Sequence, residues 1–154
     1  MELLSLSVGV GLVVSLVFSE LFGLAAGGMV VPGYVALYLH RPLDVAVTVG
    51  AGIATWGLVQ GLESLLIVYG RRRTVLMILV GYLVGMAGRG LVASAVGDAE
   101  LVDGPASVIG YIIPGLIAIW LSRQGLVETL SVLVTASVVV RLVLVAATGG
   151  EAFP

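Results

Sequence analysis

The chain contains no cysteine and no lysine, and few of its residues are charged. Without cysteine it has no disulfide, no thiolate nucleophile and no Cys-ligated metal site. Without lysine it has neither a Walker-type phosphate loop nor the amine needed for Schiff-base chemistry. Its seven arginines are scattered through 154 residues, with a formal net charge of -2. This arrangement excludes the basic surface that a nucleic-acid-binding protein needs.

Apolar residues dominate what is present. The chain is 60% hydrophobic and 10% charged, whereas about a quarter of the residues of an ordinary soluble domain are charged. A water-soluble protein of this length needs far more polar surface. The sequence therefore predicts an integral membrane protein, with lipid covering most of its surface.

The apolar stretches have the length of membrane spans. A spanning helix needs about 20 apolar residues, and stretches of this kind run over 3–22, 43–69, 74–96 and 126–148. The stretches 27–39 and 107–121 are shorter. The first stretch lacks the positive start of a signal peptide, so we expect it to be retained. The predicted fold is an all-α helical bundle, a single membrane domain over residues 1–154.

The two halves of the chain resemble each other. Residues 28–41 read GMVVPGYVALYLHR and residues 110–123 read GYIIPGLIAIWLSR, an offset of 82 residues. Apolar composition explains the Val/Ile matches, but it does not explain a Pro-Gly pair and a terminal arginine in register. We predict two related halves, at about 3–69 and 74–148, each made of a span, a broken short segment and a span.

The short segments leave two topologies open. If they cross the membrane, the protein has six spans and forms an inverted 3+3 repeat, as in many transporters. If they are re-entrant, it has four spans and a parallel repeat. With Arg71–Arg73 in the cytoplasm, six spans place Arg123 there too and leave only Arg41 outside, whereas re-entrant segments place both outside. Because positive residues favour the cytoplasm, we favour six spans.

The Pro-Gly pairs, Pro32-Gly33 and Pro114-Gly115, are the first candidate site. Proline fits the first turn of a helix, so we expect each pair to start a short helix ending near Leu39 or Leu121. The free N–H groups of two such helices at membrane depth would suit an anionic group. The alternative is a pair of proline kinks that neighbouring helices repair.

Ionisable residues within or near the ends of spans are the second candidate set. A charge at the membrane centre costs about 2.5–3.5 kcal/mol, so such residues normally face a partner or a wet cavity. The alternative is that a glutamate neutralises each arginine and only ties helices together. The residues are Glu20, Glu63, Arg89 and Arg141.

Glycines at four-residue spacing predict close helix packing. The pairs are Gly23/Gly27, Gly57/Gly61 and Gly81/Gly85.

No catalytic constellation is visible. The single histidine, His40, has no second His or Cys beside it, and no triad, paired-carboxylate or nucleotide-binding motif is present. We predict that the chain alone is not an enzyme and holds no metal and no cofactor.

Four segments resemble the PgsC/CapC family, the membrane subunit of bacterial poly-γ-glutamate (capsule) synthase, in order and spacing. They are GMVVPGYVAL at 28–37, YGRRR at 69–73, IIPGLIA at 112–118 and RQGL at 123–126. The first span, which ends Phe18-Ser-Glu20, is similar to the opening of that family.

The resemblance implies a multi-pass protein of the bacterial cytoplasmic membrane. Its partners would be a Mur-ligase-like PgsB/CapB subunit, which uses ATP and Mg²⁺ to join glutamates, and a PgsA/CapA subunit that assists export. This chain would anchor the ligase and receive or translocate the growing polyglutamate. Arginines suit that role because guanidinium matches carboxylate in bidentate geometry. We expect Arg41 and Arg123 to contact the polymer or a partner, and Arg71, Arg72 and Arg73 to be a cytoplasmic anchor.

Two other functions fit the same residues. An independent small-anion secondary transporter also suits an inverted repeat with broken helices. A purely structural anchor is the third reading, and it predicts that the intramembrane arginines matter only for stability.

Overall fold

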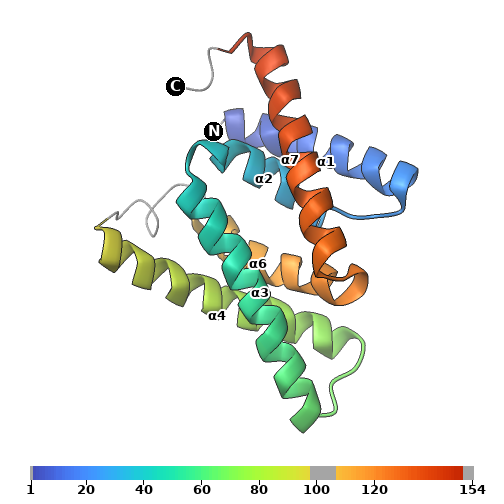
Figure 1. Ribbon diagram of the computed structural model, residues 1–154, viewed down its shortest axis with the longest axis vertical. Coiled ribbons are helices and arrows are strands. Elements are labelled where there is room, and N and C mark those ends of the chain that lie inside the picture. The colour runs from blue at the N-terminus through green and yellow to red at the C-terminus, as the bar shows by residue number, and fades with distance from the viewer. Residues whose placement is uncertain (1, 98–106, 151–154) are drawn as a thin grey trace. The chain divides into compact units, whose positions relative to one another are not determined.

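A computed structural model describes residues 2–97 and 107–150, which form six α-helices and one 3-10 helix and no strand (Figure 1). The predicted all-α fold is confirmed. The sequence between the fourth and fifth apolar stretches predicts an acidic loop with Asp98, Glu100 and Asp103, and these three residues lie outside the described ranges. The helices are α1 (Glu2–Phe22), α2 (Val31–Leu37), η1 (Tyr38–His40), α3 (Pro42–Leu65), α4 (Arg71–Val96), α6 (Ser107–Gln124) and α7 (Leu126–Thr148).

Four helices of the described chain, α1, α3, α4 and α7, are long and apolar enough to cross a membrane. They confirm the four predicted long spans, with one shift in bounds. The helix α3 ends at Leu65, and α4 begins at Arg71 instead of Thr74. Gly70, with φ +62°, directly precedes the first turn of α4. The three arginines therefore form the first turn of α4.

The two Pro-Gly pairs lie at different positions within their helices. Pro32 lies in the first turn of α2, as predicted, but Pro114 lies inside the continuous helix α6, so that prediction is wrong. Before Pro32, glycines with φ of +75° and +116° at Gly27 and Gly28 interrupt the helix. Residues 107–113 contain no such break. The backbone hydrogen-bond ladder of α6 is therefore already formed when the helix reaches Pro114, and the helix continues through the proline.

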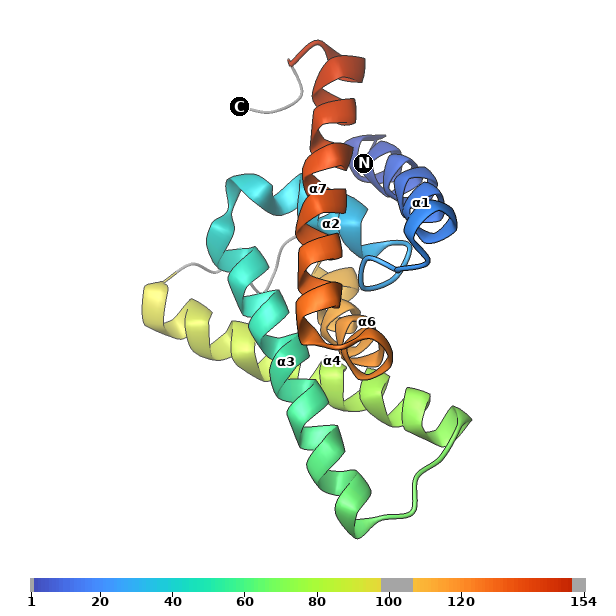
Figure 2. The ribbon, with the colours of Figure 1, turned by 45° about the vertical axis from the view of Figure 1, so that its right-hand side comes forward.

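The chain divides into two compact units. Unit 1 comprises residues 1–41 and 123–154, and its helices α1, α2 and α7 pack together (Figure 2). Unit 2 comprises residues 42–122 and holds α3, α4 and most of α6. These units are not the two sequence halves. The last helix of the first half, α3, packs in unit 2 with α4 and α6. The last helix of the second half, α7, packs in unit 1 with α1 and α2. The inverted orientation of the repeat stays a prediction.

In unit 1 the glycine of the Pro-Gly pair allows close packing. A Cβ added to Gly33 on α2 would lie 2.5 Å from the Ser7 carbonyl oxygen of α1, and one added to Gly11 would lie 2.7 Å from the Gly33 Cα. The Ser7 hydroxyl donates a 2.6 Å hydrogen bond to the Gly33 carbonyl. Ala36 of α2 packs with Val140 and Leu144 of α7.

Unit 2 repeats this arrangement. A Cβ added to Gly115 on α6 would lie 2.8 Å from the Ile78 Cα and 2.9 Å from the Met77 carbonyl oxygen of α4. Gly81 of α4 faces Gly115. In both units the Pro-Gly glycine thus rests on the backbone of the first helix of the same sequence half. The structure gives the shared motif a packing role.

The three predicted glycine pairs have different surroundings. Gly81 and Gly85 lie against α6, which confirms close packing for that pair. Gly57 and Gly61 have nothing within 4 Å of an added Cβ, so the prediction is wrong there. Gly23 and Gly27 have positive φ in the connection after α1, and nothing lies within 4 Å of a Cβ added to Gly23.

Candidate functional site

Arg89 is the centre of a buried polar cluster in unit 2. It lies on α4 and is 3% exposed. Its Nη2 donates a 2.9 Å hydrogen bond to Oγ1 of Thr48 on α3, and its guanidinium carbon lies 5.6 Å from the centre of the Tyr111 ring on α6. A cation over an aromatic face is an attractive arrangement, more so when it is desolvated. Three helices therefore hold one guanidinium in place.

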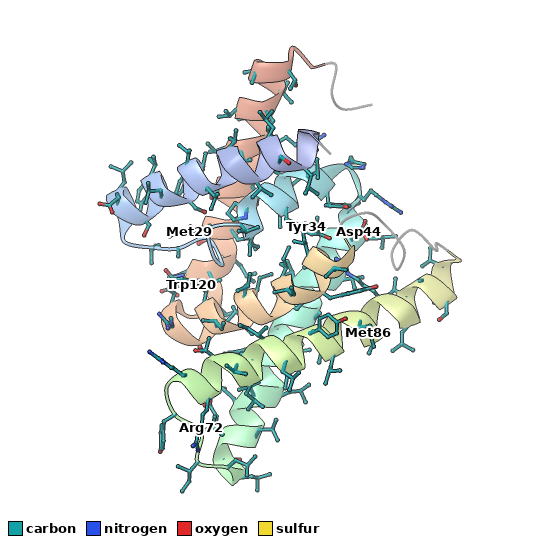
Figure 3. The ribbon with its side chains drawn as sticks, turned by 180° about the vertical axis from the view of Figure 1, so that it is seen from behind. Met29, Tyr34, Asp44, Arg72, Met86 and Trp120 are labelled. Carbon is teal, nitrogen blue, oxygen red and sulfur yellow. The ribbon has the colours of Figure 1, made fainter. Side chains whose placement is uncertain are left out.

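Asp44 adds an acid to this cluster. It lies in the first turn of α3, where Figure 3 labels it, and it is 3% exposed. The Thr48 hydroxyl donates a 2.7 Å hydrogen bond to the Asp44 carbonyl while accepting the bond from Arg89. We call Asp44, Thr48, Arg89 and Tyr111 the Arg89 cluster. It contains one acidic and one basic residue, and both are almost fully buried.

The sequence prediction included Arg89 but missed the other three residues. An acid in the first turn of a helix is common because it complements the helix dipole. Asp44 therefore gave no signal of its burial. A threonine or tyrosine in an apolar stretch is equally ordinary. These residues could have been found by a search for polar residues inside predicted spans that face each other.

Arg141 binds a helix end in unit 1. Its Nη1 donates a 3.0 Å hydrogen bond to the carbonyl oxygen of Ala36, near the end of α2. The last carbonyls of a helix have no partner in the helix, and they carry negative partial charge. Arg141 on α7 thus stabilises the end of α2 that faces away from the Pro32 turn.

Gln124 holds the chain before α2, also in unit 1. Its Oε1 accepts a 2.8 Å hydrogen bond from the N–H of Ala25, and its Nε2 donates a 2.7 Å bond to the carbonyl of the same residue. Gln124 belongs to the segment RQGL, but the sequence prediction gave its side chain no role. With the bonds of Ser7 and Arg141, it fixes the segment 25–36 from α1, the end of α6 and α7.

Glu63 and Glu20 are the glutamates that the sequence suggested as alternative partners of Arg89 and Arg141. Glu63 forms an ion pair with Arg73, because both lie near the turn that joins α3 to α4. Glu20 is exposed on α1 and has no ion pair with any residue of the described ranges. Arg89 contacts the hydroxyl of Thr48 and the ring of Tyr111. Arg141 binds the carbonyl oxygen of Ala36.

The remaining predicted residues fall in both units. Arg41 follows η1 and is partly exposed, and Arg123 is exposed in the last turn of α6. Both belong to unit 1. Pro114 offers no free helix start, so the predicted anion site at its N–H groups is wrong. The first turn of α2 is buried, Pro32 and Gly33 included, and packs on α1.

His40 lies on η1, exposed, where its Nδ1 donates a 2.9 Å hydrogen bond to the Leu37 carbonyl. Across residues 2–97 and 107–150, no three His, Cys, Asp or Glu side chains gather as a metal site would require.

Comparison with known proteins adds a family. The profile described as capsule biosynthesis CapC matches residues 10–130. Over 120 residues the chain is 33% identical to the PGA biosynthesis protein CapC of Bacillus subtilis (strain 168), covering 77% of this chain and 78% of that protein. Over 128 residues it is 33% identical to the capsule biosynthesis protein CapC of Bacillus anthracis, covering 82% and 83%. No solved structure gives a significant match. The matched range contains the whole Arg89 cluster.

Proposed function

Because this chain belongs to the CapC family of capsule biosynthesis proteins, we propose that it is the membrane subunit of a bacterial poly-γ-glutamate synthase in the cytoplasmic membrane. The observation that carries the proposal is the identity of 33%, over most of both chains, with a protein named for PGA biosynthesis. The four helices of spanning length support the membrane part of the assignment.

In this proposal a separate subunit performs the chemistry. A Mur-ligase-like partner binds ATP and Mg²⁺ and forms the amide bonds, and a second partner assists export. The described residues of this chain lie almost entirely in apolar helices. Helices of this kind suit an anchor for the ligase and a path for its product.

The product explains the need for arginines. Each unit of a γ-linked glutamate chain keeps a free carboxylate, so the polymer is a polyanion. Lipid opposes its passage strongly, and positive side chains inside spans lower that barrier. Arg89 on α4 and Arg141 on α7 place guanidinium groups within two candidate spans. Arg41 and Arg123 lie at helix ends, where they are accessible to carboxylates. Guanidinium stays charged and binds carboxylate with two parallel hydrogen bonds.

Three matched preparations test the proposal: membranes with this chain alone, the ligase subunit alone, and both together. We expect ATP-dependent glutamate polymerisation only with both, and we expect the ligase to sediment with membranes only when this chain is present. Polymerisation by this chain alone, or a ligase that stays soluble beside it, would contradict the proposal. Uptake of a small anion into vesicles that hold this chain alone would support the transporter function instead.

A further inference from the structure

The start of α4 carries a feature that the proposed polymer path does not include. Arg71 and Arg72 are exposed there and border an apolar groove of about 340 Å³. The groove is lined further by Val75, Leu76 and Leu79, which lie one and two turns along the same helix. Along α4, two positive charges in the first turn are therefore followed by an apolar surface over the next two turns.

Of the three consecutive arginines, one has an acidic partner among the described residues and two do not. Arg73 forms an ion pair with Glu63 of α3. Arg71 and Arg72 make no ion pair with any residue in 2–97 or 107–150. Figure 3 labels Arg72 at the start of α4, beside the turn from α3. Two neighbouring guanidinium groups without an acid in reach attract an anion from outside the protein.

The apolar part of the groove is placed to meet lipid tails. Val75 is 64% and Leu79 55% exposed, and both lie on a helix of spanning length. The arginines stand at the end of that helix, which is the level of the lipid head groups. Tyr69, 80% exposed in the adjacent turn, is of the residue type enriched at that level.

We propose that Arg71, Arg72 and the groove of Val75, Leu76 and Leu79 bind one anionic phospholipid. The guanidinium groups bind the phosphate, which in phosphatidylglycerol carries the one net negative charge of the lipid, and an acyl chain lies along the groove. An acidic protein segment matches the arginines but not a groove of apolar side chains on a spanning helix. The site is independent of any polymer role, because it requires only the first turns of α4.

Lipid binding to the full chain, purified in neutral detergent, tests the site. Native mass spectrometry measures the affinity for phosphatidylglycerol, with phosphatidylcholine and inorganic phosphate as comparison probes. The wild type is expected to prefer phosphatidylglycerol and to bind inorganic phosphate much more weakly. The variant R71Q/R72Q is expected to bind phosphatidylglycerol about 30-fold more weakly, the loss expected for two arginines at a lipid surface.

Two further variants make the result specific. R41Q/R123Q removes the same charge from unit 1 and is expected to keep the wild-type affinity. L76W keeps both arginines but fills the groove, and it is expected to lose the preference for phosphatidylglycerol over inorganic phosphate. V75W repeats this test at a more exposed position if L76W does not fold, as judged by its unfolding temperature.

Several results would overturn the proposal. They are equal wild-type affinity for the two lipids, unchanged affinity in R71Q/R72Q, an equal loss in R41Q/R123Q, or full lipid preference with the groove filled. If R71Q/R72Q keeps its lipid and instead loses co-sedimentation with the ligase, the arginines serve a protein partner. That outcome rejects the lipid site and leaves the proposed function intact.

Discussion

The closest approach of two helices in unit 2 permits a sharp test at Gly81. This glycine of α4 faces Gly115 of α6, and a Cβ built on it would overlap the Cα and N atoms of Gly115. Both are backbone atoms, so no side-chain rotation relieves the overlap and the helices must move apart. Forcing an extra methyl group into a packed core typically costs about 1–3 kcal/mol. We expect Gly81→Ala to lower the free energy of unfolding by that amount relative to its control.

Gly88→Ala is the matched control. Gly88 lies on the same helix, and nothing approaches within 4 Å of its added Cβ. Alanine replaces glycine in both variants, so both gain up to about 1 kcal/mol of helix propensity. The difference between the two variants therefore isolates the overlap at Gly81.

The assay is reversible unfolding of the purified protein in mixed detergent micelles. Its two tryptophans, Trp56 on α3 and Trp120 on α6, both lie in unit 2 and report its unfolding by fluorescence. Equal stability of Gly81→Ala and Gly88→Ala would refute the close approach of α4 and α6. Gly115→Ala repeats the test from α6, because its added Cβ would lie 2.8 Å from the Ile78 Cα.

Three further predictions address charge and topology. Arg89→Lys keeps the charge but loses the planar group over Tyr111 and the bond to Thr48, so we expect about 1–3 kcal/mol lower unfolding free energy; an unchanged value would show that the cluster does not hold the helices. Arg41→Lys and Arg123→Lys lose the bidentate fork, so we expect less polymer at unchanged membrane level; normal polymer yield would leave them as interface anchors. With six spans and Arg71–Arg73 inside, a cytoplasm-only reporter fused after Pro154 should be silent, and a bright one would favour re-entrant segments.

The spans could be predicted because their signal is local. Each long apolar run is visible in about 20 consecutive residues, and all four appear as helices of spanning length. The helix start at Pro32 was predictable for the same reason. The continuity of α6 through Pro114 was not, because it depends on the helix formed before the proline and on neighbours that tolerate the kink.

The partners of Arg89 and Arg141 could not be predicted because they are distant in sequence. Arg89 and Thr48 are 41 residues apart, and Arg141 and Ala36 are 105 residues apart. The cost of burying charge predicts that a partner exists, but not which one. A glutamate was one alternative partner that the sequence suggested for each arginine. Hydroxyl, carbonyl and aromatic groups are too common in apolar runs to be singled out.

The last helix of each sequence half packs with the first two helices of the other half. The halves that the repeat defines in the sequence are therefore not the compact units of the fold. In unit 1, α2 is only seven residues long, and a helix of that length is unstable without tertiary packing. Part of that packing comes from α7, through Val140, Leu144 and the bond from Arg141 to the end of α2. The next α-helix along the chain, α3, instead packs in unit 2. The short helix therefore reaches its final environment only when the last helix of the chain is in place, and neither half can complete its own core.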